Sequence, residues 1–167
     1  MIPAEELRYL ILALQREGNR LLAAGLRPLR LTPSQAETLR VLADHQPLTL
    51  TGLGELLVCE SGDNPSRLVD RLVKIGLVRR EVDEGDRRQV SLTLTPAGER
   101  QARDVATVEA ELHSAIESLV VDQPLDQTLT LLRTLADTFP AGQALARRRT
   151  AVGEAAGRRR ASRREQR

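Results

Sequence analysis

The stretch that decides the fold is CESGDNPSRLVDRLVKIGLVRR, which runs from Cys59 to Arg80. It begins with turn-forming residues 61–63, after which Asn64 is suited to cap a helix and Pro65 to occupy its first position. Apolar side chains then recur at helical spacing, at Leu68, Val69, Leu72, Val73 and Ile75. The stretch therefore predicts a short amphipathic helix that Gly76 ends.

The polar face of this predicted helix carries most of its charge. It is formed by Ser66, Arg67, Asp70, Arg71 and Lys74. Arginine is suited to forked hydrogen bonds with guanine edges or phosphate oxygens. Such a face alone is also typical of an ordinary surface helix. The neighbouring elements therefore have to distinguish a DNA-binding helix from a surface helix.

Two strands with a charged turn follow the helix. The apolar residues Val90, Leu92 and Leu94 alternate with polar ones, and they pair with Leu77-Val78 as a predicted β-hairpin. Its turn holds the acids Asp83, Glu84 and Asp86, which favour turn formation, and then Arg87 and Arg88 side by side.

Two helices and a short extended segment precede the stretch. The segment LTPSQAETLRVLADHQ, residues 31–46, opens with Thr32 as a predicted cap and Gln35 in capping-box register. Its buried face is expected at Ala36, Leu39, Leu42 and Ala43. Residues 48–50 are expected to be extended, and Thr51 to cap a brief helix packed through Leu53, Leu56 and Leu57. This order of elements is that of a winged helix-turn-helix.

Long apolar stripes flank this module on both sides. Helices are predicted from Pro3 to about Gly25, from Pro96 to about Val121, and from Leu125 to Phe139. Their inward residues were expected to include Leu10, Leu14, Val105, Ile116 and Leu119. Stripes of this length need a partner surface, which favours a homodimer. The predicted fold class is mainly α with a small β-hairpin wing.

Composition limits the class of protein. The 167 residues fit one domain, and no uncharged apolar stretch is long enough for a membrane helix. The acids near the start do not suit a signal peptide, and Cys59 is the only cysteine, so we expect a cytoplasmic protein without disulfides.

Charge is segregated along the chain. Nine arginines and two glutamates lie from Arg147 to the end, a net charge of +7, whereas the other residues together carry −5 of the total of +2. A basic tail on an acidic body suggests an arm for a polyanion, with a solvated terminus as the alternative. We expect residues 141–167 to be a flexible Arg-rich tail.

Four segments in this order resemble the MarR family of transcriptional regulators: LTPSQAETLRVL, PLTLTGLGELL, SRLVDRLVKIGLVRR and DRRQVSLTLTPAG. The resemblance implies a winged-helix domain over residues 1–140. Residues 31–95 would be the DNA-binding lobe, and residues 1–30 and 96–140 the dimerisation helices. It also implies a pseudo-palindromic operator and a small-molecule effector bound between the helices and the lobe, where Leu10, Leu14 and Leu39 are weak pocket candidates.

The resemblance implies a set of DNA-contacting residues. They are Asn64, Pro65, Ser66, Arg67, Arg71 and Lys74 on the recognition helix, with Arg87 and Arg88 on the wing. Asp70 resembles an aspartate that pairs with a wing arginine in this family. We therefore expect Asp70 or Asp86 to orient Arg88 while Arg87 contacts DNA, or the reverse.

Other chemistry is weakly signalled. Cys59 beside Glu60 is read as a small packed residue rather than a redox sensor. His113 lies four residues after Glu109, but a metal site needs three or four converging ligands, so a solvent-facing pair is the preferred interpretation. No phosphate-binding loop or catalytic triad signature is present in the sequence, so we expect neither an enzyme nor a cofactor.

The sequence thus predicts a homodimeric regulator, a ligand-responsive repressor that binds double-stranded DNA specifically. Two alternatives remain at this point. The winged helix could serve as a protein-interaction scaffold, or the basic tail could drive sequence-tolerant architectural binding of DNA.

Overall fold

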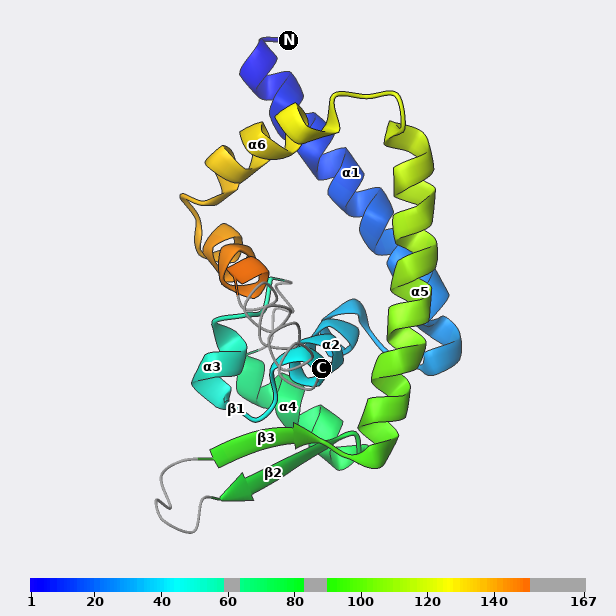
Figure 1. Cartoon of the computed structure of the whole chain (residues 1–167), viewed down its shortest axis with the longest axis vertical. Coiled ribbons are helices and arrows are strands. Elements are labelled where there is room, and N and C mark those ends of the chain that lie inside the picture. Colours follow the sequence, from blue (N-terminus) through cyan, green and yellow to red (C-terminus); the bar gives the residue numbers. More distant parts are fainter. Residues whose placement is uncertain (59–63, 83–89, 151–167) are drawn as a thin grey trace, which may run out of the picture.

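The computed structural model describes residues 1–58, 64–82 and 90–150 of the chain. Its elements in order are α1 (Pro3–Leu26), the 3-10 helix η1 (Arg27–Leu29), α2 (Pro33–His45), β1 (Leu48–Thr49), α3 (Leu50–Gly54), α4 (Pro65–Lys74), β2 (Val78–Val82), β3 (Val90–Leu94), α5 (Pro96–Val120) and α6 (Leu125–Ala136). Residues 140–150 are helical as well. The predicted fold class, mainly helical with a small sheet, is confirmed (Figure 1).

The sheet contains the predicted hairpin and one strand more. β2 and β3 pair antiparallel, with Val78 opposite Leu94 and Val82 opposite Val90. The short β1 adds to the other edge of β3, where Leu48 lies opposite Leu92, so the strand order is β1-β3-β2. The extended residues before α3 therefore belong to the sheet, a pairing that local sequence does not reveal.

The elements from α2 to β3 form one unit, which we call the compact lobe. Its core is made of Leu39, Leu42, Leu53, Leu72 and Leu92, all fully buried. The ends of α1 and α5 that face the lobe complete this core through Leu26, Ala102 and Val105. The lobe is thus a helix-on-sheet arrangement with a continuous apolar interior.

One local expectation about α2 and one about α3 were wrong. Ala43 is exposed and Val41 takes its place in the core, because α2 is covered on more than one side. Thr49, rather than Thr51, caps α3, and its side chain accepts the N–H of Gly52 at 3.0 Å. The capping box of Thr32 and Gln35 on α2 is confirmed.

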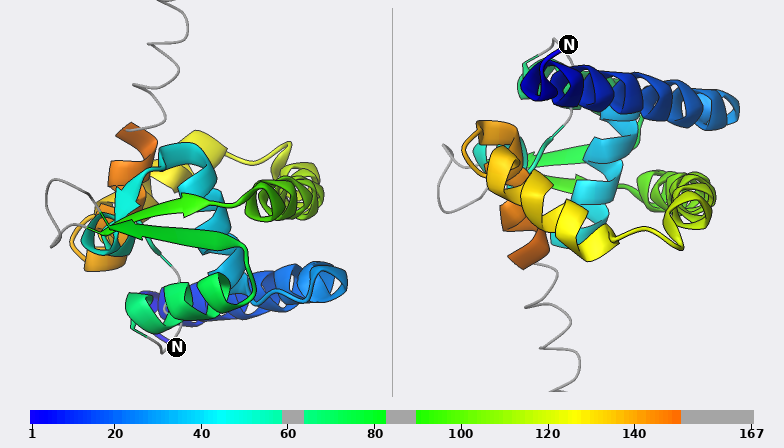
Figure 2. Two further views of the ribbon diagram at one scale, coloured as in Figure 1. Left: turned by 90° about the horizontal axis from the view of Figure 1, so that it is seen from below. Right: turned by 90° about the horizontal axis from the view of Figure 1, so that it is seen from above.

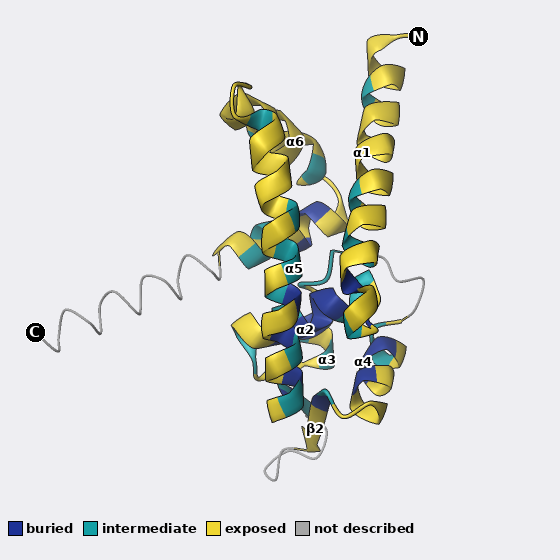
Figure 3. Cartoon of the chain, turned by 90° about the vertical axis from the view of Figure 1, so that its right-hand side faces the viewer, coloured by how far each residue is buried: buried dark blue, intermediate teal, exposed yellow. Residues whose placement is uncertain are grey.

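Helices α1, α5 and α6 make up the second unit, the helical module. α1 and α5 pack closely near the compact lobe, where a Cβ added to Gly25 would lie 2.6 Å from Cγ1 of Val108. Away from the lobe they diverge, and most of their surface is exposed (Figure 3). Ile116 and Leu119, expected to face inward, are 48% and 80% exposed in the single chain. Among the described residues, no helix has the length and apolar character that crossing a membrane requires.

Candidate nucleic-acid interface

Helix α4 forms where the sequence predicts it because both of its ends are specified locally. The Asn64 side chain accepts the N–H of Ser66 at 3.0 Å, and Pro65 occupies the first turn. At the other end Gly76 adopts a φ of 75°, and the N–H of Leu77 donates to the carbonyl of Leu72 at 3.0 Å. These caps set where α4 begins and ends.

The buried face of α4 leaves its basic face in solvent. Leu68, Val69 and Leu72 are buried against the compact lobe. Val73 and Ile75, expected on the same apolar stripe, are instead 37% and 54% exposed. Of the predicted DNA-contacting residues, Asn64, Arg67, Arg71 and Lys74 are exposed, whereas Pro65 and Ser66 are half-buried. The structure therefore brings these predicted residues together on a single helix, at the edge of the lobe that also carries the sheet (Figure 2).

An ion pair connects α4 to the hairpin. Nη2 of Arg80 on β2 lies 2.9 Å from Oδ1 of Asp70, and both side chains are substantially exposed. The sequence placed Asp70 against a wing arginine, with Asp86, Arg87 and Arg88 as the other members, but those three lie outside the described residues. In the part of the chain that the structure describes, the partner of Asp70 is Arg80.

Sequence reasoning missed Arg80, although a signal was present. Val78 is buried, and alternation along β2 places Arg80, two residues later, on the same face of the strand. That face is the one against which α4 packs. The neighbouring Arg79 pairs within the strand, 3.2 Å from Glu81. The position of Arg80, two residues after the buried Val78, therefore indicated a contact with α4.

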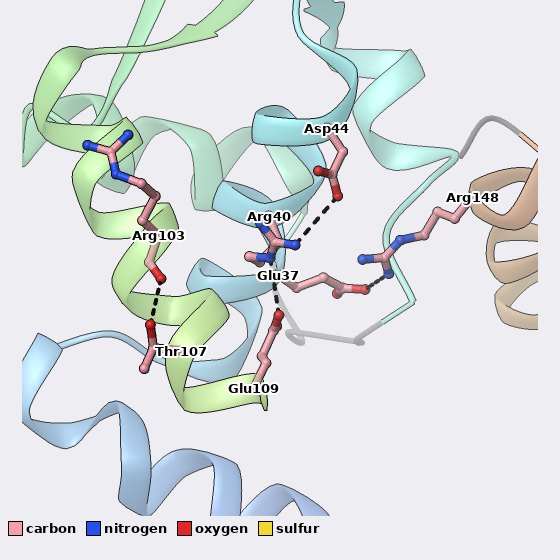
Figure 4. A network of polar contacts seen from close by, with 7 residues as sticks. All are labelled: Glu37, Arg40, Asp44, Arg103, Thr107, Glu109 and Arg148. Carbon is pink, nitrogen blue, oxygen red and sulfur yellow. Dashed lines mark hydrogen bonds and ion pairs between the residues drawn. The ribbon is translucent and has the colours of Figure 1, made fainter. Parts of the chain in front are cut away.

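A second polar network joins α2 to α5. Nε of Arg40 is 3.1 Å from Oε2 of Glu109 on α5, and the same guanidinium is 3.8 Å from Asp44 (Figure 4). Glu109, considered above as one half of a metal-binding pair with His113, is thus an ion-pair partner of α2. Cys59 lies outside the described residues.

A cavity of about 220 Å³ opens beside this network. Residues of α2, β3 and α5 line it, among them Arg40, Ala43, Gln46, Leu94, Ala102 and Arg103. The Gln46 side chain accepts the N–H of Leu94 at 2.6 Å and closes one wall. The earlier pocket candidates do not line it: Leu39 is fully buried, and Leu10 and Leu14 are 55% and 73% exposed.

The arrangement defines the class of the protein. A capped helix with an exposed basic face, placed beside a β-hairpin and held to it by an ion pair, is a winged helix-turn-helix. The family model that matches residues 31–90 is the MarR family. That match spans the compact lobe as far as the first residue of β3, so this part of the chain is similar to the MarR family.

A named transcriptional regulator is similar to part of this chain. The organic hydroperoxide resistance transcriptional regulator of Bacillus subtilis (strain 168) is 32% identical over 93 residues, which are 56% of this chain and 63% of that protein. The chain thus spans less than two thirds of the length of this relative.

Solved structures extend the likeness over the helical module. A mutant MarR from E. coli complexed with operator DNA is 29% identical, with a TM-score of 0.65 over 81% of this chain and 94% of that one. The S. aureus MepR–DNA complex has a TM-score of 0.72 over 79% of this chain and 97% of that one. At 22% identity, MepR shows the shared fold alone.

Proposed function

We propose that the protein is a transcriptional regulator that binds a specific DNA operator as a homodimer. The observation that carries this proposal is the exposed basic face of α4, with Arg67, Arg71 and Lys74 beside the Asp70–Arg80 ion pair. In a winged helix such a face enters the major groove, and arginine reads guanine there. The likeness to a MarR crystallised on operator DNA supports the same use of this surface.

The helical module supports the dimer. Leu14 on α1, Leu119 on α5, and Phe139 after α6 are 73%, 80% and 63% exposed. Other large apolar side chains on α1 and α6 are exposed as well, namely Tyr9, Leu10, Ile11, Leu12, Leu131, Leu132 and Leu135. A second copy would cover these stripes and place two α4 helices for a two-fold operator.

The cavity between α2 and α5 suits a regulatory ligand. Arg40, Arg103 and Glu99 line it beside the apolar side chains of Leu94 and Ala102, so we propose a small effector that joins polar groups to an apolar ring or chain. Such a ligand would touch both the compact lobe and the helical module. It would release DNA if it favoured a spacing of the two α4 helices that misses the half-sites, which makes the regulator a ligand-responsive repressor.

Selection of bound duplexes from a random pool tests the function. An inverted repeat is the expected result, because two-fold protein symmetry is mirrored in the operator. A protein-interaction scaffold would select no duplex, and an architectural binder would enrich no sequence. Either result would overturn the proposal.

Variants locate the binding face. Arg67→Ala and Arg71→Ala are each expected to weaken operator binding by about 1–3 kcal/mol. Arg20→Ala is the matched control, because it removes the same charge from an exposed pair with Glu17 on α1. Equal effects of all three substitutions would contradict recognition by α4.

A further inference from the structure

The helical segment of residues 140–150 returns from the helical module to the compact lobe. After α6 the chain turns, and this segment lies next to α3 in Figure 1. Gly142 allows the sharp return, because a Cβ there would overlap the carbonyl oxygen of Ala136. Ala144 is 3% exposed, so the segment is packed against its surroundings. Sequence reasoning had assigned residues from 141 onward to a flexible tail, and the structure has the first ten of them as helix.

Consecutive arginines of this segment bind acceptors in the compact lobe. Nε–H of Arg147 donates to the carbonyl of Glu55, the C-cap of α3, at 3.2 Å. Nη1 of Arg148 lies 2.7 Å from Oε1 of Glu37 on α2 (Figure 4). These contacts cross 92 and 111 positions of sequence. Arginines that the composition attributes to a polyanion-binding arm are therefore used within the chain.

Glu37 connects the segment to Val58, which precedes α4 in the chain. Its Oε1 also accepts the N–H of Val58 at 2.8 Å, and Val58 is the last residue described before Asn64. The same carboxylate oxygen thus contacts the segment and the backbone of Val58. Because Glu37 lies on α2, which packs against α4, a shift of Glu37 would disturb both Val58 and the packing of α4.

Burial makes the Arg148–Glu37 pair different from its neighbour. The side chains are 26% and 10% exposed, whereas those of Arg149 and Asp137, 4.0 Å apart, are 41% and 53% exposed. Removing one partner of a largely buried ion pair is strongly destabilising. An exposed pair contributes little, because water screens it.

We propose that residues 140–150 are a strut between the two units, and that Arg148 is a positioning residue for operator recognition. By holding Glu37, it fixes Val58 and α2, the helix against which α4 packs, relative to the helical module. The inference rests on the proposed DNA-binding function, and it adds a control point far from the DNA-contacting face. Release of the segment from α2 would lower operator affinity without removing any DNA contact.

The experiment compares Arg148→Gln with Arg149→Gln in the full chain. Both remove one positive charge from adjacent positions, so any direct attraction of this segment to DNA changes equally. Arg148→Gln is expected to weaken operator binding about five- to tenfold, the low end of coupling between distant sites, with an unchanged salt slope. Arg149→Gln is expected to stay within about twofold of wild type.

Two further variants separate positioning from general destabilisation. Gly142→Ala displaces the segment without a charge change and is expected to weaken binding as Arg148→Gln does. In the Glu37→Gln, Arg148→Gln double variant the amide oxygen still accepts the Val58 N–H and no buried charge is left unpaired. This variant is expected to regain most of the lost affinity, a coupling that a double-mutant cycle measures.

Hydrogen exchange at the Val58 amide makes the outcomes distinguishable. Arg148→Gln is expected to speed this exchange, and Arg149→Gln to leave it unchanged. If wild type binds no duplex, the proposed function fails, while faster exchange still supports the strut. Unchanged exchange, or equal losses of affinity in both single variants, would overturn the strut.

Discussion

The compact lobe and the helical module differ in how far their large apolar side chains are buried within one chain. The lobe hides Leu39, Leu53, Leu72 and Leu92 completely within one chain. The module leaves leucines of similar size in solvent, with Leu119 80% exposed. The burial pattern thus changes along α5, from Val105, fully buried beside the lobe, to an exposed far end.

The difference teaches that the two units need different partners. A side chain in the lobe gains its burial from its own chain, so its removal should cost folding free energy directly. A side chain on the module gains burial only by association, so its removal should chiefly affect assembly. Matched leucine substitutions, one in each unit, test this division directly, and substitutions within a single unit sharpen it.

The largest expected effect is that of Leu39→Ala. This side chain is 0% exposed, so the cavity left behind should lower the free energy of unfolding by about 2–5 kcal/mol, measured by chemical denaturation. Leu14→Ala deletes the same atoms at a 73% exposed site of the module. At low protein concentration it should cost less than about 0.5 kcal/mol. Similar losses from both would contradict the division.

A pair of glycines gives the next effect. A Cβ at Gly98, in the first turn of α5, would overlap the carbonyl oxygen of Leu77, so Gly98→Ala should cost about 1–3 kcal/mol of stability. Gly18 on α1 has nothing within 4 Å of its added Cβ. Gly18→Ala should therefore be neutral or stabilising by up to about 1 kcal/mol, as helix propensity dictates. Thermal unfolding of both variants checks the sign.

The next prediction concerns which residue caps α3 in the compact lobe. Thr49→Ala removes the acceptor of the Gly52 N–H and should cost about 1 kcal/mol. Thr51→Ala, at the cap expected from sequence, should cost less than about 0.5 kcal/mol. A reversed order in urea denaturation would mean that α3 begins later than the structure has it.

The smallest effect on folding is expected for Leu119→Ser. This substitution should change the free energy of unfolding of the monomer by no more than about 0.5 kcal/mol, because the side chain is mostly in solvent. It should instead raise the dimer dissociation constant, measured by analytical ultracentrifugation. Unchanged association would remove Leu119 from the proposed dimer surface.

Local sequence determined the helix ends and the elements of the winged helix. Thr32 with Gln35, Asn64 with Pro65, and Gly76 act on backbone groups a few residues away, so their effect can be read without knowing the fold. Periodicity likewise predicted the burial of Leu68, Val69 and Leu72 on α4, although Val73 and Ile75 of the same stripe are exposed. The confirmed antiparallel pairing of β2 and β3 required only alternation.

Tertiary structure decided the contacts between elements. The partner of Asp70 is Arg80, β1 joins β3, and Arg148 reaches Glu37 across 111 positions. Each of these contacts depends on how packed helices and strands lie relative to one another. No local sequence pattern encodes which residues distant in sequence come into contact. The sequence by itself therefore determined the parts of a DNA-binding domain and its basic face. Packing alone decided which charges hold that face in place, because an ion pair forms only between side chains that the core has already brought together.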